Sequence, residues 1–162
     1  MKLLKNRRIK IFILSLNIIL IDQISKFIVL STLGYENTKN IIPNLLNLTL
    51  VKNKGAAFSL FSNSTLLLTI TSILASFLIT GFIFKSPHKS YWNSMGLAYL
   101  LGGTMGNGID RIFKGYVLDF LDLVNVNFAI FNVADIAINI SILCFIVDLF
   151  SDKYQSINTL KK

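Results

Sequence analysis

The run Ser64–Phe84, STLLLTITSILASFLITGFIF, contains no charged residue and is long enough to cross a lipid bilayer. About 20 predominantly apolar residues in a helix span the ~30 Å hydrocarbon core. The chain as a whole suits that setting, since 53% of its residues are hydrophobic, 15% are charged and its mean hydropathy is +0.63. The run therefore predicts a membrane-spanning helix within one membrane domain, residues 1–162.

Three further runs have the same character. Together they predict an all-α polytopic membrane protein with four transmembrane helices, at about residues 10–31, 64–84, 94–113 and 129–150. The first run could instead be a secretory signal peptide, because basic residues precede it. It lacks a small-residue cleavage site, however, and continues through Asp22 and Lys26. We interpret it as a retained first helix.

The segment 32–63 between the first two runs has a different pattern. Asn44–Asn53, NLLNLTLVKN, alternates apolar and polar residues, and the turn signal Asn53-Lys54-Gly55 ends it. This pattern predicts a strand. We expect a small β-sheet and loop region between helices one and two, resting at the membrane surface.

The basic residues predict the orientation of the helices. Ten bases and two acids lie before the first run, between the second and third, and at or beyond the end of the fourth, whereas the rest of the chain has six of each. The net charge of +8 therefore falls on one side. Because lysine and arginine mark the cytoplasmic side, both termini should be cytoplasmic and residues 32–63 and 114–128 should face outward. The pI of 9.7 thus indicates orientation and anchoring, and we expect no nucleic-acid partner.

Polar residues gather at the outer ends of the predicted helices. Asp22 and Lys26 share a helix face at i, i+4. Others lie at the end of helix three, in the connection after it, and at one-turn spacing in helix four: Asn107, Asp110, Arg111, Asp119, Asp122, Asn132, Asp135 and Asn139. Ionisable groups at membrane depth are costly and usually mark function.

Two of these carboxylates indicate a reaction. Asp119 and Asp135 bracket a short connection at similar depth, where two acids that meet tend to share one proton. One member could then activate water while the other donates a proton. Structural readings stay open: Asp119 or Asp122 could be a helix cap or an interfacial residue. Asp22–Lys26 and Asp110–Arg111 could be structural pairs, and the glycines at 96, 102, 103, 106 and 108 could let helices approach closely.

Other catalytic chemistries lack support in the sequence. The single Cys144 lies in the fourth run and fits a buried packing residue, and the single His88 lies in the polar segment SPHKS. There is no HExxH, no CxxC and no phosphate-binding glycine loop. We predict no metal and no cofactor.

Five motifs occur in the order found in the lipoprotein signal peptidases, which the chain resembles over nearly its whole length. They are DQISK (22–26), NKGAAFS (53–59), GGTMGNGIDR (102–111), GYVLDFLD (115–122) and FNVADIAI (131–138). The resemblance implies an aspartyl endopeptidase of the bacterial cytoplasmic (inner) membrane that removes signal peptides from prolipoproteins. It implies that cleavage falls just before a diacylglyceryl-modified cysteine. It also implies a small extracytoplasmic sheet and a helix on the membrane surface.

The resemblance also assigns roles to residues. It implies that Asp119 and Asp135 are the catalytic pair at the extracytoplasmic face and that Asp122 has no catalytic role. The residues implied to support substrate binding and the site are Asp22, Lys26, Asn53, Gly55, Asn107, Asp110, Arg111 and Asn132. The chain departs from the family pattern at Gly108, where a bulkier apolar residue is common, and at Ile136 and Asn139, where small residues are frequent.

The expected partners are lipid-modified prolipoproteins and membrane lipids, and we expect the protein to act as a monomer. The alternative from another class is a small transporter or channel subunit in which the acids form a proton or cation path. Such a path should place acids at several depths, whereas this chain concentrates them at one face.

Overall fold

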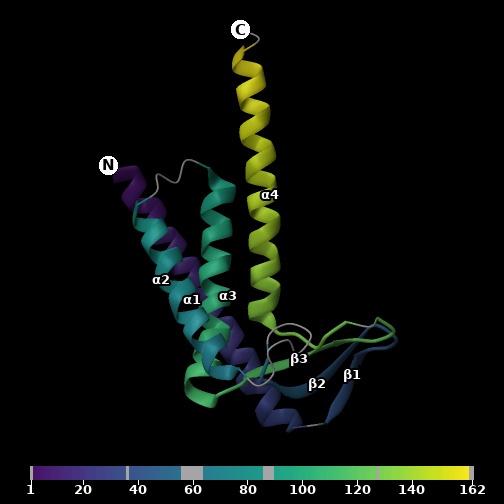
Figure 1. The fold of residues 1–162 in the computed structure, drawn as a ribbon. Helices are drawn as coiled ribbons and strands as arrows, with labels where there is room; N and C mark the ends of the chain where they lie inside the picture. The colour runs from purple at the N-terminus through teal and green to yellow at the C-terminus, as the bar shows by residue number, and fades with distance from the viewer. Residues whose placement is uncertain (1, 36, 56–63, 86–89, 127, 161–162) are drawn as a thin grey trace.

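The structure, a computed structural model, describes residues 2–35, 37–55, 64–85, 90–126 and 128–160. Four helices run side by side and a small sheet projects from one end of them (Figure 1). The helices are α1 (Lys2–Leu33), α2 (Thr65–Lys85), α3 (Tyr91–Lys114) and α4 (Val133–Leu160). The strands are β1 (Thr38–Ile42), β2 (Leu46–Asn53) and β3 (Val117–Leu123). The surface helix that the resemblance implies is not among the helices of the described residues.

Three of the helices are long and apolar enough to cross a membrane: Arg7–Leu33 in α1, Thr65–Lys85 in α2 and Val133–Ser151 in α4. The fourth predicted span, at 94–113, does form a helix, but α3 is not among these three. Its glycines, Asn107, Asp110 and Arg111 lower its hydropathy. These residues suit a helix that contacts protein more than lipid.

α3 is the central helix, and it packs against α1, α2 and α4. Small residues make this packing possible, as the glycine pattern predicted. A Cβ atom on Gly103 would lie 2.5 Å from the carbonyl oxygen of Ala134, and one on Gly106 would lie 2.8 Å from Oδ2 of Asp22. α1 and α4 therefore come close enough to α3 for polar side chains to meet between them.

The sheet is antiparallel in the order β1-β2-β3. The predicted strand is confirmed as β2, but the sheet is not confined to the segment between the first two helices, because β3 follows α3. Its residues pair with β2, so that Asp119 lies opposite Val51 and Val117 opposite Asn53. Buried Leu118 and Phe120 pack with Leu50 and with Val29 of α1. The apolar residues of VLDFLDL thus hold β3, and with it Asp119, against the end of the helix bundle.

α4 begins at Val133, later than the predicted start at 129, because the preceding residues are held in extended form. Phe131 exchanges backbone hydrogen bonds with Leu121 of β3, which keeps the chain from entering the helix earlier. Asp135 consequently lies in the first turn of α4.

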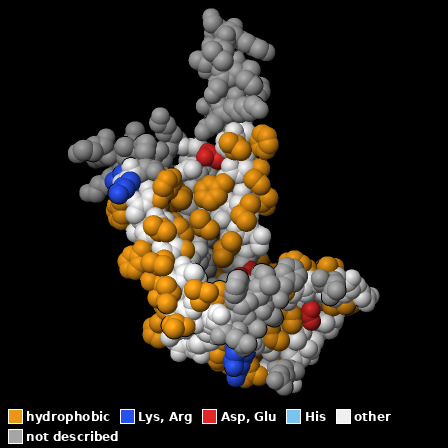
Figure 2. Space-filling view, viewed as in Figure 1, with side chains coloured by type: hydrophobic (Ala, Val, Ile, Leu, Met, Phe, Trp, Pro, Cys, Tyr) orange, Lys and Arg blue, Asp and Glu red, His pale blue; other side chains and the backbone are white. Residues whose placement is uncertain are grey.

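The two ends of the bundle differ. Both termini lie at the end opposite the sheet (Figure 1). Hydrophobic side chains cover most of the visible helical surface between these ends, with few charged ones among them (Figure 2). Large apolar residues exposed on the helices include Phe27, Leu66, Phe77, Leu78 and Leu149. Such a surface suits lipid.

Candidate active site

Asp119 lies in β3 with its side chain buried at 2% exposure. Asn53 Nδ2 donates to Asp119 Oδ2 over 2.8 Å, and Asn132 Nδ2 donates to Asp119 Oδ1 over 2.6 Å. Each carboxylate oxygen therefore accepts from an asparagine, one at the end of β2 and one at the start of α4.

Asp135 is held at the N-terminus of α4 by reciprocal contacts with Asn132. The backbone N–H of Asp135 donates to Asn132 Oδ1 over 3.0 Å, and the backbone N–H of Asn132 donates to Asp135 Oδ2 over 3.1 Å. This is a capping box, in which the cap residue and the third helical residue satisfy each other's backbone groups. Asn107 of α3 donates to the other oxygen, Oδ1, over 2.8 Å. The motif Asn-Val-Ala-Asp thus starts the helix and fixes the carboxylate.

The two carboxylates share Asn132. Its side-chain amide donates to Asp119 while its own backbone N–H donates to Asp135. The structure therefore brings together the two acids that the sequence predicted to meet across the connection between β3 and α4. Their charges interact, and this interaction disfavours ionisation of both at once.

Burial raises the pKa of Asp119 from 3.8 to about 6. The hydrogen bond from Asn53 lowers that pKa, the charge of Asp135 raises it, and the hydrogen bond from Asn132 lowers it again. The net result is a carboxyl group that changes its charge near neutral pH. A group with such a pKa is suited to proton transfer.

The three asparagines have defined amide orientations. An ammonium or a backbone N–H can only donate, so it must face an amide oxygen, and the amide nitrogen then points the other way. Lys26 Nζ donates to Asn107 Oδ1 over 3.0 Å, and the N–H of Gly55 donates to Asn53 Oδ1 over 2.9 Å. Every one of the three amide nitrogens is thereby directed at a carboxylate.

Lys26 lies at the centre of a buried ion cluster. Its Nζ is 2.8 Å from Asp22 Oδ2 and 3.0 Å from Asp110 Oδ2, and all three side chains are fully buried. With Asn107 as the third acceptor, the ammonium has a partner for each proton. The predicted Asp22–Lys26 pair is confirmed. Because Asp22 Oδ1 also accepts from the N–H of Ala134 over 3.0 Å, the cluster ties α1 to the first turn of α4.

Asp110 and Arg111, which the sequence suggested as a possible structural pair, do not pair with each other. Asp110 Oδ1 instead pairs with Lys114 at 2.8 Å, and Oδ2 accepts from the N–H of Leu118 over 3.2 Å. Arg111 donates to the carbonyl of Gly55 over 3.3 Å and to Ser72 Oγ over 3.4 Å. Consecutive helix residues point in different directions, so neighbours in sequence seldom meet.

The structure also shows the surroundings of three other residues that the sequence singled out. Asp122 accepts from Thr49 Oγ1 over 2.9 Å on the sheet. Asn139 is exposed and bonds the carbonyl of Asp135, so it does not extend the polar stripe into the site. Cys144 is buried, as predicted. In the described ranges, His, Cys, Asp and Glu side chains form no group that could hold a metal ion.

Two residues of the site were missed. Gln23 donates to Asp22 Oδ2, to the carbonyl of Gly106 and to Asp110 Oδ1, and Lys114 pairs with Asp110. The i, i+4 spacing of Asp110 and Lys114 was a usable signal. Gln23 carried none, since two of its three partners, Gly106 and Asp110, lie on another helix.

Comparisons with known proteins identify the family of the chain. Residues 14–151 match the family described as Signal peptidase (SPase) II. The chain belongs to the signal peptidase II family. The match includes every candidate site residue, from Asp22 to Asp135.

Similar proteins lie within the same family. The lipoprotein signal peptidase of Parasynechococcus marenigrum is 45% identical over 86% of this chain and 87% of its own length. That of Streptococcus agalactiae is 37% identical over 91% and 96%. Two solved structures described as a bacterial membrane enzyme superpose with TM-scores of 0.82 and 0.78, at 28% and 29% identity. They cover 89% and 88% of this chain, and 89% and 94% of their own.

Proposed function

We propose that Asp119 and Asp135 are the catalytic pair with which this signal peptidase removes signal peptides from prolipoproteins. The observation that carries the proposal is Asn132, which bonds both carboxylates. The pKa of Asp119, raised to about 6, supports it further.

The pair acts with one proton between its two members. The ionised carboxylate takes a proton from a water molecule as the water oxygen attacks the carbonyl carbon of the scissile bond. The protonated carboxyl donates to the carbonyl oxygen, and a proton then passes to the leaving amine as the C–N bond breaks. The asparagine amides at 53, 107 and 132 stabilise the ionised form by donating to it.

The substrate is a prolipoprotein whose cysteine carries diacylglycerol, and cleavage falls just before that cysteine. The names of the relatives, lipoprotein signal peptidases, support this class of substrate. The signal peptide enters from the bilayer while the acyl chains stay in lipid. Arg111 and Gly55, which contact each other beside the site, orient the substrate backbone. The enzyme acts as a monomer with membrane lipids around it, and no nucleic acid takes part.

The site faces the extracytoplasmic side of the bacterial inner membrane. The four helices cross the bilayer, with α3 packed against the other three, and both termini lie in the cytoplasm. The bases at the terminal end and the polar site at the sheet end support this orientation. Nothing in the comparisons supports the transporter alternative.

Isosteric substitution of each acid tests the catalytic pair. Asp119→Asn and Asp135→Asn should each lower kcat/KM on a diacylglyceryl-modified precursor by ~10³-fold or more, because the proton donor or the base is lost. Asp122→Asn is the matched control, since Asp122 lies on the same strand and should keep activity within about twofold. Full activity in either folded variant of the pair would disprove the assignment.

A further inference from the structure

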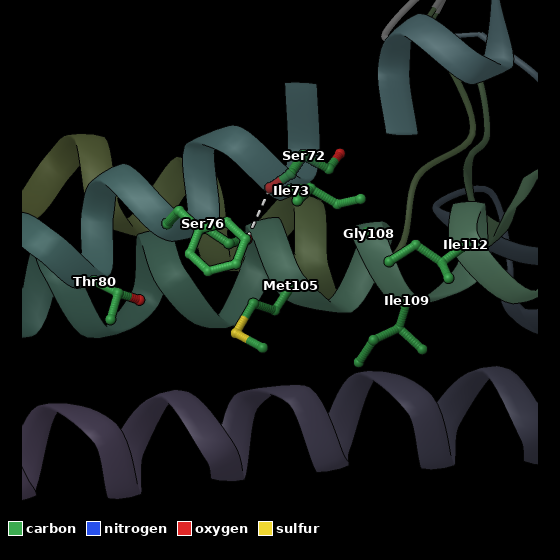
Figure 3. A pocket seen from close by; sticks show the side chains of 9 residues that line it. Ser72, Ile73, Ser76, Thr80, Met105, Gly108, Ile109 and Ile112 are labelled. Atoms are coloured by element: carbon green, nitrogen blue, oxygen red, sulfur yellow. Dashed lines mark hydrogen bonds between the residues drawn. The ribbon is translucent and has the colours of Figure 1, made fainter. Parts of the chain in front are cut away.

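A groove of about 260 Å³ lies between α2 and α3, away from the catalytic pair. Most of its lining is apolar, including Ile73 of α2 and Met105 and Ile109 of α3 (Figure 3). The hydroxyls of Ser72 and Ser76 in this lining already donate to carbonyls within α2. Such a lining does not recognise a charged group.

A cluster of the opposite character lies where α1 meets the sheet. It consists of Tyr35, Lys52 and Tyr116, and we call it the tyrosine–lysine cluster. Lys52 Nζ lies over the rings of both tyrosines, 4.1 Å from the centroid of Tyr35 and 5.2 Å from that of Tyr116. The two tyrosine hydroxyls lie 3.1 Å apart and share a hydrogen bond. The ammonium is therefore held beside two rings, each of which attracts a cation to its face.

The local structure of three segments brings these residues together. Tyr35 follows Gly34, which ends α1 in the left-handed conformation with a φ of 72°. Tyr116 follows Gly115, which ends α3 in the same way with a φ of 74°. Lys52 lies near the end of β2 with its side chain exposed. Each glycine turns the chain out of its helix, so that a tyrosine lies on either side of the lysine.

The cluster has more hydrogen-bond donors than acceptors. An ammonium has three N–H donors and no acceptor, and among the described residues Lys52 forms no ion pair. The bond between the tyrosines uses one of their two hydroxyl protons. This hydrogen bond with Tyr116 raises the pKa of Tyr35 to about 12, so the hydroxyl of Tyr35 stays protonated. An exposed ammonium and one O–H therefore remain free to bind an anion.

The position of the cluster indicates which anion it meets. The apolar span of α1 ends at Leu33, so Tyr35 lies at the level of the lipid headgroups. Exposed Ile21, Ile24 and Ile28 form an i, i+3, i+7 stripe that runs along α1 towards this end. A ligand with an anionic group at the cluster and hydrocarbon along the stripe would satisfy both surfaces. A phospholipid has this form.

We infer that the tyrosine–lysine cluster binds the phosphate of a phospholipid in the leaflet on the sheet side of the membrane. Lys52 supplies the positive charge and N–H donors, and a tyrosine hydroxyl supplies a further donor. Hydrogen bonds from an ammonium to phosphate are shorter and stronger than those between neutral groups. Because Lys52 directly precedes Asn53, a bound headgroup would hold the backbone of β2 beside the residue that donates to Asp119. The inference does not depend on the proposed function.

Titration of the purified chain in detergent with dioleoyl phosphatidylglycerol tests this, with bound lipid counted by native mass spectrometry. Lys52→Met should weaken one binding event by about tenfold, because the phosphate loses its charged partner. Lys52→Arg should restore the binding, since a guanidinium also stacks on aromatic rings and binds phosphate. Lys39→Met is the matched control. It removes the same charge from an exposed position of β1 and should keep the wild-type affinity.

Two outcomes with these variants would overturn the inference. Equal weakening in Lys52→Met and Lys39→Met would indicate general attraction of the lipid to basic residues. Unchanged binding in folded Lys52→Met would show that Lys52 only braces the two tyrosines. Lys52→Gln, which is also neutral, replaces the methionine variant if that variant does not fold.

Two further ligands identify what the cluster recognises. Dioleoylglycerol has the same acyl chains without the phosphate, and its binding should be equal in the wild type and in Lys52→Met. A loss of dioleoylglycerol binding in the variant would contradict recognition of phosphate. Inorganic phosphate at the concentration of the lipid should leave the lipid bound. Displacement of the lipid by inorganic phosphate would identify a free anion as the ligand and would also contradict the inference.

Discussion

The two ends of the bundle differ in how many polar groups they bury. Near the termini, α1, α2 and α3 pack through Ile11, Ile83, Leu97 and Leu101, all nearly inaccessible to solvent. At the sheet end an apolar cluster of Val29, Leu50, Leu118 and Phe120 is accompanied by six buried polar groups. These are Asp22, Lys26, Asn107, Asp110, Asp119 and Asn132. Apolar contacts tolerate small shifts, whereas buried charges require defined partners. The positions of the side chains are therefore more closely defined at the sheet end, as a catalytic site requires.

The polar end is also a connected network. Lys26 orients the amide of Asn107, which donates to Asp135, while Asn132 links Asp135 to Asp119. Loss of one member of the network should therefore weaken the contacts of the others. Loss of one apolar contact at the terminal end should leave the neighbouring contacts unchanged. Three substitutions probe this difference.

The largest effect is expected for Lys26→Met. It leaves Asp22 and Asp110 buried with their shared cation removed, and breaking a buried ion pair costs about 3–5 kcal/mol. Thermal unfolding in detergent should show a loss of that size in the free energy of unfolding. Ser15→Ala is the comparison at the apolar end, because Ser15 is also buried on α1 and bonds the carbonyl of Ala98 of α3. It should cost only about 1 kcal/mol.

A second variant separates unpaired charge from lost packing. Adding Asp22→Asn to Lys26→Met removes one uncompensated carboxylate and should recover part of the stability. If the double variant were less stable than Lys26→Met alone, the cluster would owe its stability to packing and hydrogen bonding more than to charge.

The next effect is expected at Asn132, where helix capping and the link between the acids can be separated. Serine can still accept from the N–H of Asp135, but it is too short to keep the bond to Asp119. Asn132→Ser should lower kcat/KM by about 10- to 100-fold with most of the stability retained, since the orientation of Asp119 is lost. Asn132→Ala should lose about 1 kcal/mol more, because the cap is lost as well. Equal stability of the two variants would show that the cap is not the structural role of this residue.

The sequence predicted the parts of the fold that a bilayer imposes and missed those set by distant contacts. The long apolar runs and the i, i+4 pair of Asp22 and Lys26 depend on local spacing, and both appear in the structure. The start of α4 was placed too early because Phe131 is held by Leu121 of β3, ten residues away in the chain. β3 itself was missed: its residues fell in the predicted connection 114–128, and the strand with which they pair, β2, lies about 70 residues earlier in the chain.

The site shows the same division. Asp119 and Asp135 were predicted as a pair because the connection between them is short. The ion pair of Asp110 with Lys26 was not predicted, because Lys26 lies on another helix. The adjacent Arg111, which the sequence suggested as the partner, points elsewhere. The orientation of each asparagine amide also depends on donors from other elements. Long-range geometry of this kind has no signature in a single sequence.

The smallest of the three effects concerns the pH dependence of cleavage. Asn53 donates to Asp119 and so stabilises its ionised form. In Asn53→Ala the ionised form loses this support, and the pKa of Asp119, about 6 in the intact protein, should rise. The limb of the pH profile of kcat/KM that reports Asp119 should move to higher pH by roughly one to two units, since one hydrogen bond to a charged group is worth about 1.5–3 kcal/mol. The direction is the same whether Asp119 acts as base or as acid, because either role follows its own ionisation.

Thr49→Val provides the matched control for that shift. Thr49 lies on the same strand as Asn53 and donates to Asp122 instead of Asp119. Its removal should leave the pH profile in place, because Asp122 lies outside the linked pair. A shift to lower pH in Asn53→Ala would mean that access of water to Asp119, and not loss of the hydrogen bond, dominates there. Equal shifts in both variants would show that the sheet as a whole, and not one amide directed at one carboxylate, sets the ionisation of the site.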